Sequence, residues 1–301
     1  MAKPMPKQYE AVEIAQAVID RMSESKDERF KTIMSGLVKH LHAFIRETEL
    51  TSEEWMTAIQ FLTATGQKCD DKRQEFILLS DTLGVSMLVV ALEQARYAAA
   101  MKNKPGVNMP TEATVQGPFF TVGAPKLPLG ADIANNPETT PTLYSGRVMD
   151  TAGQPIADCL LDVWSGDDEG FYDLQKGENA PMELRAQFRT DQDGRYHYWS
   201  LKPSLYPVPI DGPVGKMLMS MGRHPYRPGH MHTMLRAPGY HSLVTHLFVA
   251  DSEYLDSDAV FGVRNSLIVD FKAHPAGPAP DGRIMAKPWF HAEYDFRLAP
   301  V

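Results

Sequence analysis

The chain divides into two parts that differ in the spacing of their apolar residues. Up to about residue 101, apolar side chains recur at intervals of three and four, which predicts helices over 9–22, 27–48, 51–67, 70–82 and 85–100. Residues 27–48 show this stripe clearly, with apolar residues at Phe30, Ile33, Met34, Leu37, Val38, Leu41, Phe44 and Ile45. Thr51 and Glu54 have the spacing of a capping box, and Gly84 predicts a bend between the last two helices.

From about residue 142 the pattern becomes one of short strands and tight turns. Strands are expected over 144–149, 160–164, 188–190, 196–199, 231–236, 245–249, 266–271 and 294–298. Asp193 and Gly194, between two of these strands, predict a hairpin. Short strands at this spacing favour an antiparallel β-sandwich. We therefore expect an α+β protein with a helical N-terminal region, residues 1–104, and a β-sandwich catalytic domain, residues 105–301.

Composition narrows the classes of function. The 301 residues carry a net charge of −8, which argues against nucleic acid or an anionic membrane as the main partner. Cys69 and Cys159 are far apart and predict no disulfide framework, so we expect a cytoplasmic protein. The first residues lack the apolar core of a signal peptide. The most apolar stretch, residues 76–92, is short for a membrane span, so no membrane insertion is expected.

Two His-x-His pairs occur, at His40 and His42 and at His230 and His232. On a strand, residues two apart project from the same face, so His230 and His232 can reach one metal ion. On a helix, residues two apart do not face each other, so His40 and His42 are interpreted as ordinary helix residues. Strand geometry alone leaves His230 and His232 open between metal ligands and structural histidines.

Several motifs occur in the order found in one enzyme family. Asp162-Val163-Trp164 through Gly170-Phe171-Tyr172, then Tyr206, then Arg227-Pro228-Gly229-His230-Met231-His232 resemble the intradiol ring-cleaving dioxygenases, which are non-haem ferric enzymes. The resemblance implies that Tyr172, Tyr206, His230 and His232 bind one Fe(III) per subunit and that O2 is the co-substrate. It also implies that Arg227 lines the active site and that Tyr206 accepts a proton from the substrate. Two nitrogens and two hard oxygens suit ferric iron better than zinc.

Within this family, the segment from Thr245 to Val249 and the segment from Tyr254 to Val263 are similar to members that cleave hydroxyquinol (benzene-1,2,4-triol). That similarity implies 3-hydroxy-cis,cis-muconate, which tautomerises to maleylacetate, as the product. Catechol or a chlorocatechol, giving cis,cis-muconates, is the alternative. His246 is either a hydrogen-bond donor beside the metal or a core histidine. Asp81 is either a helix cap or a partner for the additional ring hydroxyl.

The remaining expectations concern the substrate pocket and the partners of the chain. The residues expected to contact the substrate are Leu78, Asp81, Val115, Gln116, Gly117, Pro118, Phe119, Pro207, Val208, Pro209 and Arg227. The apolar helical stripes predict a homodimer through the N-terminal helices, and the resemblance implies a bound phospholipid there. A β-sandwich binding module with zinc or a structural metal is an interpretation from a different class.

Overall fold

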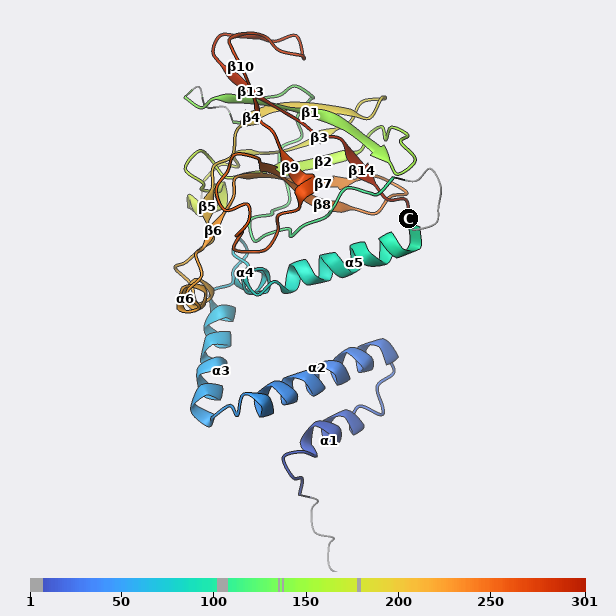
Figure 1. The fold of residues 1–301 in the computed structure, drawn as a ribbon, viewed down its shortest axis with the longest axis vertical. Coiled ribbons are helices and arrows are strands. Elements are labelled where there is room, and N and C mark those ends of the chain that lie inside the picture. Colours follow the sequence, from blue (N-terminus) through green and yellow to red (C-terminus); the bar gives the residue numbers. More distant parts are fainter. Residues whose placement is uncertain (1–7, 102–107, 135, 137, 178–179) are drawn as a thin grey trace, which may run out of the picture. The chain divides into compact units, whose positions relative to one another are not determined.

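The computed structural model describes residues 8–101, 108–134, 136, 138–177 and 180–301 (Figure 1). Its helices are α1 (Ile14–Asp20), α2 (Glu28–Glu47), α3 (Ser52–Gln67), α4 (Glu75–Thr82), α5 (Val85–Met101) and α6 (Pro213–Ser220), with single 3-10 turns η1 (Asp173–Gln175) and η2 (Asn265–Leu267). The pattern of apolar residues predicted the first five helices but not α6. The chain forms two compact units that meet within α3, one ending at Thr63 and one beginning at Ala64. The expected boundary between residues 104 and 105 lies outside the described residues.

In the first unit, the helix starts follow from local side-chain chemistry. The Asp27 carboxylate accepts the N–H of Phe30 at 2.9 Å and so caps α2. At α3, the Thr51 N–H donates to Glu54 Oε2 at 2.9 Å and the Glu54 N–H donates to Thr51 Oγ1 at 3.3 Å, which confirms the capping box. The stripe on α2 stays open to solvent, with exposed fractions from 50% to 55% at Phe30, Ile33, Leu37, Leu41 and Phe44.

The second unit is built on two five-stranded sheets. One contains β10 (Lys272–His274), β13 (Trp289–Glu293), β1 (Pro141–Asp150), β14 (Phe296–Leu298) and β4 (Arg195–Leu201), and the other contains β3 (Arg185–Arg189), β2 (Leu160–Trp164), β7 (His230–Arg236), β8 (Leu243–Val249) and β9 (Ile268–Val269). Two short ladders add β5 (Tyr206–Pro207) with β6 (Tyr226–Arg227), and β11 (Gly277–Pro278) with β12 (Ile284–Met285). Figure 1 shows the two sheets stacked face to face, with α5 on the side of the β7–β8 sheet. The α+β class and the β-sandwich are confirmed.

Most neighbouring strands are antiparallel, but three pairs are parallel: β1 with β13, β1 with β14, and β8 with β9. The periodicity of the sequence did not indicate these pairs, because alternation along one strand carries no information about the direction of its neighbour. Strands β1 and β14 are far apart in sequence, and the chain between them supplies all five strands of the second sheet.

The predicted hairpin at Asp193 and Gly194 is wrong. Gly194 has a φ of +71° and its N–H donates to Asp191 O at 3.0 Å, so the turn does form. However, β3 pairs with β2 while β4 pairs with β1, so the chain crosses from one sheet to the other. The reason is packing: Phe188 and Tyr198, one from each strand, stack with ring centroids 4.9 Å apart in the core between the sheets.

The α4–α5 pair is bent by 68° at Gly84, which has a φ of +74°, so the predicted bend is confirmed. No single helix among the described residues is long and apolar enough to cross a membrane; the bent pair Glu75–Thr82 and Val85–Ala100 meets the length and composition criteria only when taken together.

Successive side chains of β7 point alternately to the core and to the candidate site. Met231 and Leu235 project into the apolar core between the two sheets. His230 and His232 therefore project from the opposite face of the same strand. Both histidines are nevertheless 1% exposed, because other segments of the second unit cover that face.

Candidate metal centre

Three segments bring two tyrosines to the two histidines of β7. Tyr172 lies at the end of the loop after β2 and immediately precedes η1. Tyr206 begins the short strand β5, where it lies directly opposite Arg227 of β6. Arg227 is three residues before His230, so the β5–β6 ladder and β7 place these groups around one point. The structure thus brings together all four predicted ligands and Arg227.

The potential ligand atoms of these four residues lie close together. Tyr172 Oη is 3.0 Å from His232 Nε2 and 3.3 Å from Tyr206 Oη, and His230 Nε2 is 3.1 Å from His232 Nε2. Each of the four residues is at most 4% exposed. Two ligand atoms that bind one ion at about 2 Å and at right angles lie about 3 Å apart. The observed spacing therefore fits atoms arranged around a single metal ion.

The protonation of the histidines also suits metal binding. His230 Nδ1 must donate to Pro228 O, at 2.7 Å, because a carbonyl oxygen only accepts, and this leaves Nε2 without a proton, as a metal ligand atom must be. Burial, reinforced by the Arg227 cation, lowers the pKa of His230 to about 3. Burial likewise lowers the pKa of His232 well below its ordinary value. Both imidazoles are neutral near pH 7, which is the form that binds a metal.

The pKa of Tyr172, which lies at the same point, is shifted in the opposite direction. Burial, and then the neighbouring Tyr206, raise the pKa of Tyr172 well above its ordinary value. A phenolate at this position therefore needs a cation beside it, and a bound metal ion lowers the pKa of the group that ligates it.

His246 is a neighbour of the four potential ligands. The ligand atoms of His230, His232 and His246 lie within 4.8 Å of one another, so these three histidines also form a set that can hold a metal ion. His246 Nδ1, however, lies 3.5 Å from Arg227 Nη2, and its ring stacks on His230 with centroids 4.5 Å apart. Because the two tyrosine oxygens complete a tighter cluster, we assign His246 to the surroundings of the site.

Arg227 is buried together with a carboxylate that the sequence analysis did not single out. Its Nε donates to Asp258 Oδ1 at 2.9 Å and its Nη2 donates to Asp258 Oδ2 at 3.2 Å, and both side chains are 2% exposed. Its Nη1 lies 3.1 Å from His230 Nε2 and 3.4 Å from Tyr206 Oη. Burial alone would lower the Arg227 pKa, but Asp258 and the tyrosines outweigh it, and the net pKa is raised. A permanent cation therefore faces the ligand atoms. Asp258 lies in the segment from Tyr254 to Val263 that the sequence analysis noted, but its pairing with Arg227 could not be read there, because the two residues are 31 positions apart.

The predicted substrate contacts differ in burial. Leu78, Asp81, Val115 and Val208 are between 1% and 4% exposed. Phe119 stacks on Tyr172 with centroids 4.4 Å apart, and a Cβ at Gly117 would lie 3.4 Å from the His232 ring. Pro118 and Pro209 are half-buried, whereas Gln116 and Pro207 are exposed.

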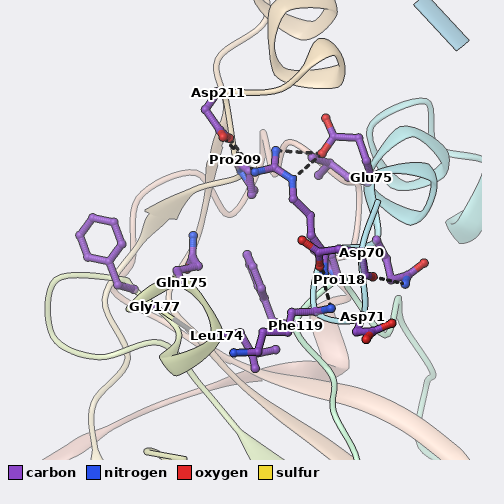
Figure 2. Close-up of a pocket in the computed structure, with 15 residues that line it drawn as sticks. Asp70, Asp71, Glu75, Pro118, Phe119, Leu174, Gln175, Gly177, Pro209 and Asp211 are labelled. Carbon is purple, nitrogen blue, oxygen red and sulfur yellow. Dashed lines mark hydrogen bonds and ion pairs between the residues drawn. The ribbon is translucent and has the colours of Figure 1, made fainter. Parts of the chain in front are cut away.

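A cavity of about 750 Å³ lies beside Phe119, whose ring stacks on Tyr172, but the four potential ligands and Arg227 are not among the residues that line it (Figure 2). Of the predicted contacts, Leu78, Pro118, Phe119 and Pro209 line it. Arg73 links two sides of the cavity, since its Nη2 is 2.8 Å from Glu75 Oε2 and its Nη1 is 2.9 Å from Asp211 Oδ1. Phe119 belongs to both regions, because it lines the cavity and stacks on Tyr172.

A β-sandwich that gathers two tyrosines, two histidines and an arginine at one buried point defines a class of metal-dependent enzyme. Residues 115–300 match the protein family described as Dioxygenase, and residues 27–101 match the family described as Catechol dioxygenase N terminus. The chain belongs to the intradiol dioxygenase family, and it is an enzyme.

Known proteins agree with this assignment over the whole chain. It is 43% identical over 304 residues to the hydroxyquinol 1,2-dioxygenase of Nocardioides simplex, covering 100% of both chains. It is 44% identical to the 6-chlorohydroxyquinol 1,2-dioxygenase of Cupriavidus pinatubonensis, covering 98% of this chain and 99% of that protein. The crystal structure of hydroxyquinol 1,2-dioxygenase from Pseudomonas putida is similar with a TM-score of 0.82 and 45% identity, covering 97% of this chain and 99% of that one.

Proposed function

We propose that this chain is an Fe(III)-dependent dioxygenase that cleaves hydroxyquinol between its vicinal hydroxyl groups. Both atoms of O2 enter the product, which is 3-hydroxy-cis,cis-muconate or its tautomer maleylacetate. The observation that carries the proposal is the convergence of Tyr172, Tyr206, His230 and His232, with contacts of 3.0 to 3.3 Å, beside Arg227. The two relatives described above act on hydroxyquinol and 6-chlorohydroxyquinol, which supports the substrate class.

The proposed ligands of the iron are Tyr172, Tyr206, His230 and His232, one ion per chain. Their atoms fit it because phenolate oxygens are hard donors that favour a ferric ion, and because the imidazoles are held neutral. When bound, ferric iron acts as a Lewis acid that lowers the pKa of the substrate hydroxyls and activates the diol toward O2.

Three side chains are proposed to accept a proton, stabilise charge and donate a hydrogen bond during the reaction. Tyr206 lies 3.4 Å from the Arg227 cation, which stabilises a phenolate, so Tyr206 is the proposed acceptor of a substrate proton. Arg227 remains charged and stabilises negative charge on the ring. His246 Nδ1 accepts from Arg227, so its Nε2 carries the proton, and it is the proposed hydrogen-bond donor to a reacting oxygen.

Asp81 is the proposed partner of the hydroxyl that distinguishes hydroxyquinol from catechol. It is 2% exposed on α4, one turn after the cavity-lining Leu78. Burial raises its pKa, which the Arg227 charge partly counteracts. A buried carboxyl group gains a strong hydrogen bond when a ring hydroxyl reaches it, and it disfavours an apolar ring edge at the same place. The other proposed substrate contacts, Val115, Gly117, Phe119 and Val208, are apolar or small; Gln116, Pro207, Pro118 and Pro209 are nearer the solvent.

O2 uptake tests the substrate proposal. Purified, iron-loaded protein should consume O2 rapidly with hydroxyquinol and slowly with catechol at equal concentration, and the product should have the ultraviolet spectrum of maleylacetate. Asp81→Ala should lower kcat/KM for hydroxyquinol by about 10-fold or more, the cost of leaving one charge-assisted hydrogen bond unmade, and should affect catechol less. Asp71→Asn, at an exposed carboxylate that lines the cavity beside Leu78, is the control. If the wild-type protein prefers catechol or a chlorocatechol, the proposed ring-cleavage reaction stands, but hydroxyquinol is refuted as the substrate.

Colour and metal analysis test the cofactor. Phenolate bound to Fe(III) gives a red-brown protein, whereas a zinc protein is colourless. A colourless, iron-free preparation that added iron does not activate would refute the ferric proposal and favour the binding module.

The helical region supports a further proposal, that the chain is a homodimer through its N-terminal helices. Five large apolar side chains of α2 are each about half exposed, which is unfavourable in water unless a partner covers them. Light scattering should give the mass of a dimer, and Leu37→Lys with Leu41→Lys should give a monomer, whereas Lys39→Glu, between them on α2, should not. A monomeric wild-type protein at micromolar concentration would contradict this.

Phospholipid at that interface stays a prediction, tested by mass spectrometry of lipid extracted from the purified protein. A cytoplasmic location also stays a prediction, tested by cell fractionation.

A further inference from the structure

A second buried ion pair adjoins the ligand cluster. Arg185 on β3 donates from Nε to Asp173 Oδ2 at 2.6 Å and contacts Oδ1 through Nη2. Both side chains are 2% exposed. Asp173 is the residue directly after Tyr172, so the pair is attached to the backbone that carries a proposed iron ligand.

The Arg185 guanidinium also binds the backbone of Phe119, whose ring packs against Tyr172. Arg185 Nη1 donates to the carbonyl oxygen of Phe119 at 3.3 Å. The Phe119 ring stacks on the Tyr172 ring, with centroids 4.4 Å apart and an angle of 20° between planes. Arg185 therefore fixes both the segment that carries Tyr172 and the ring that packs against it.

Both carboxylate oxygens of Asp173 also accept hydrogen bonds from the backbone. Its Oδ1 accepts the N–H of Leu174 at 2.8 Å, and its Oδ2 accepts the N–H of Glu183 at 3.2 Å. The carboxylate thus orders η1 and the approach to β3 together. Tyr172 lies in a loop with no strand partner of its own, so these contacts restrict where its phenol oxygen can lie.

Sheet register connects this arrangement to the histidines. Arg185, Trp164, His232 and His246 lie directly opposite one another in a row across β3, β2, β7 and β8. All four are at most 4% exposed, and the Trp164 ring stacks on His232 with centroids 4.6 Å apart. Arg185 is therefore anchored to the same row of the sheet that holds a histidine ligand.

We infer that the Arg185–Asp173 pair is a positioning device that sets the Tyr172 oxygen at a fixed place relative to the histidine nitrogens, an inference that rests on the proposed function. The hydrogen bonds of Arg185 go to Asp173 and Phe119, so it positions the Tyr172 oxygen through these two neighbours. Two charges of opposite sign removed from water are stable only with near-complete hydrogen bonding, which this pair has. Partners that orient metal ligands in this way affect metal affinity as well as activity.

The test compares Arg185→Gln, Arg185→Lys and Asp173→Asn with the wild-type protein. Arg185→Gln should weaken iron binding by about 10-fold or more in competition with a chelator, in line with other residues that orient ligands. It should also shift the visible phenolate-to-iron absorption band, because the Tyr172 oxygen moves. Arg185→Lys keeps the charge but not the forked contact, so it should recover part of the affinity. Arg189→Gln is the control, since Arg189 lies on the same strand in an exposed ion pair with Asp158.

Two results would overturn the inference. One is an Arg185→Gln protein that is folded by circular dichroism and has wild-type iron affinity and an unshifted band. The other is a loss of thermal stability without any spectral change, which would make the pair purely structural. Where Arg185→Gln does not fold, the nearly isosteric Asp173→Asn protein decides by the same two measurements. If the wild-type protein binds no iron and consumes no O2, the proposed function fails first, and this outcome is distinct from the others.

Discussion

At the scale of single residues, two similar histidine pairs have different surroundings. His230 and His232 are 1% exposed on one face of β7. His40 and His42 lie on α2, where His40 is exposed and His42 is half-buried. The difference is one of backbone geometry, because a two-residue step keeps the same face on a strand and turns by about 200° on a helix. The interpretation of His40 and His42 as ordinary helix residues is consistent with this placement.

The buried charge of Arg227 leads to a prediction about Asp258. Replacing Asp258 with Asn leaves the guanidinium buried without the carboxylate that accepts from both its Nε and its Nη2. We expect the free energy of unfolding to fall by about 3–5 kcal/mol. Activity should also fall, because Arg227 is no longer held toward Tyr206. Urea unfolding and O2 uptake measure the two effects.

The matched control for this change is Asp158→Asn. Asp158 also pairs with an arginine, at 3.0 Å, but its side chain is 76% exposed. An exposed pair contributes about 0–1 kcal/mol, so this variant should resemble the wild-type protein. Equal losses in the two variants would show that burial of the Arg227 charge is not the cause.

At the scale of elements, the loop between β2 and η1 determines how closely Tyr172 and Tyr206 approach. Gly170 in this loop has a φ of +87°, and a Cβ there would lie 2.5 Å from the Tyr206 Cβ. The loop and β5 therefore meet backbone to backbone at this position. Only glycine permits both the left-handed conformation and the close contact.

Gly170→Ala should therefore displace Tyr206 and lower kcat strongly. Gly153→Ala is the control, because Gly153 has a similar φ of +83° but a Cβ added there would meet no atom within 4 Å. The control should lose about 1–2 kcal/mol of stability from backbone strain alone, with kcat unchanged. O2 uptake and thermal unfolding of both variants decide the matter. If Gly170→Ala loses stability but retains wild-type kcat, the close approach does not position Tyr206.

At the scale of the whole molecule, the buried histidines make stability depend on pH. Burial lowers the pKa of His230 to about 3, and it also lowers the pKa values of His232 and His246 well below the ordinary value. In the unfolded chain these groups have a pKa of about 6.5. Between those values the unfolded chain binds more protons than the folded one, so acid favours unfolding.

We therefore expect the iron-free protein to lose stability as the pH falls from about 6.5 toward 3, by up to about 1.4 kcal/mol per pH unit for each buried histidine. Urea unfolding at several pH values measures this slope. His246→Gln should have a shallower slope than the wild-type protein, whereas His40→Gln, which removes an exposed histidine, should not. Equal slopes in the wild-type and His246→Gln proteins would contradict the argument.

The sequence by itself determined the features that depend on neighbouring residues. Apolar periodicity predicted five helices, the spacing of Thr51 and Glu54 predicted the capping box, and Gly84 predicted the bend, because helix starts and bends are decided within a few residues. Alternation predicted that His230 and His232 share a face. The ordered motifs identified the family, and the structure brings the four predicted ligands together.

Tertiary structure alone decided which distant segments meet. The turn at Gly194 is local, but its strands join different sheets because Phe188 and Tyr198 are buried against each other. The pairing of Asp258 with Arg227 and that of Arg185 with Asp173 are likewise not visible in the sequence. A buried charge is recognisable only once the fold has removed it from water and placed its partner beside it, and that depends on the packing of the whole sandwich.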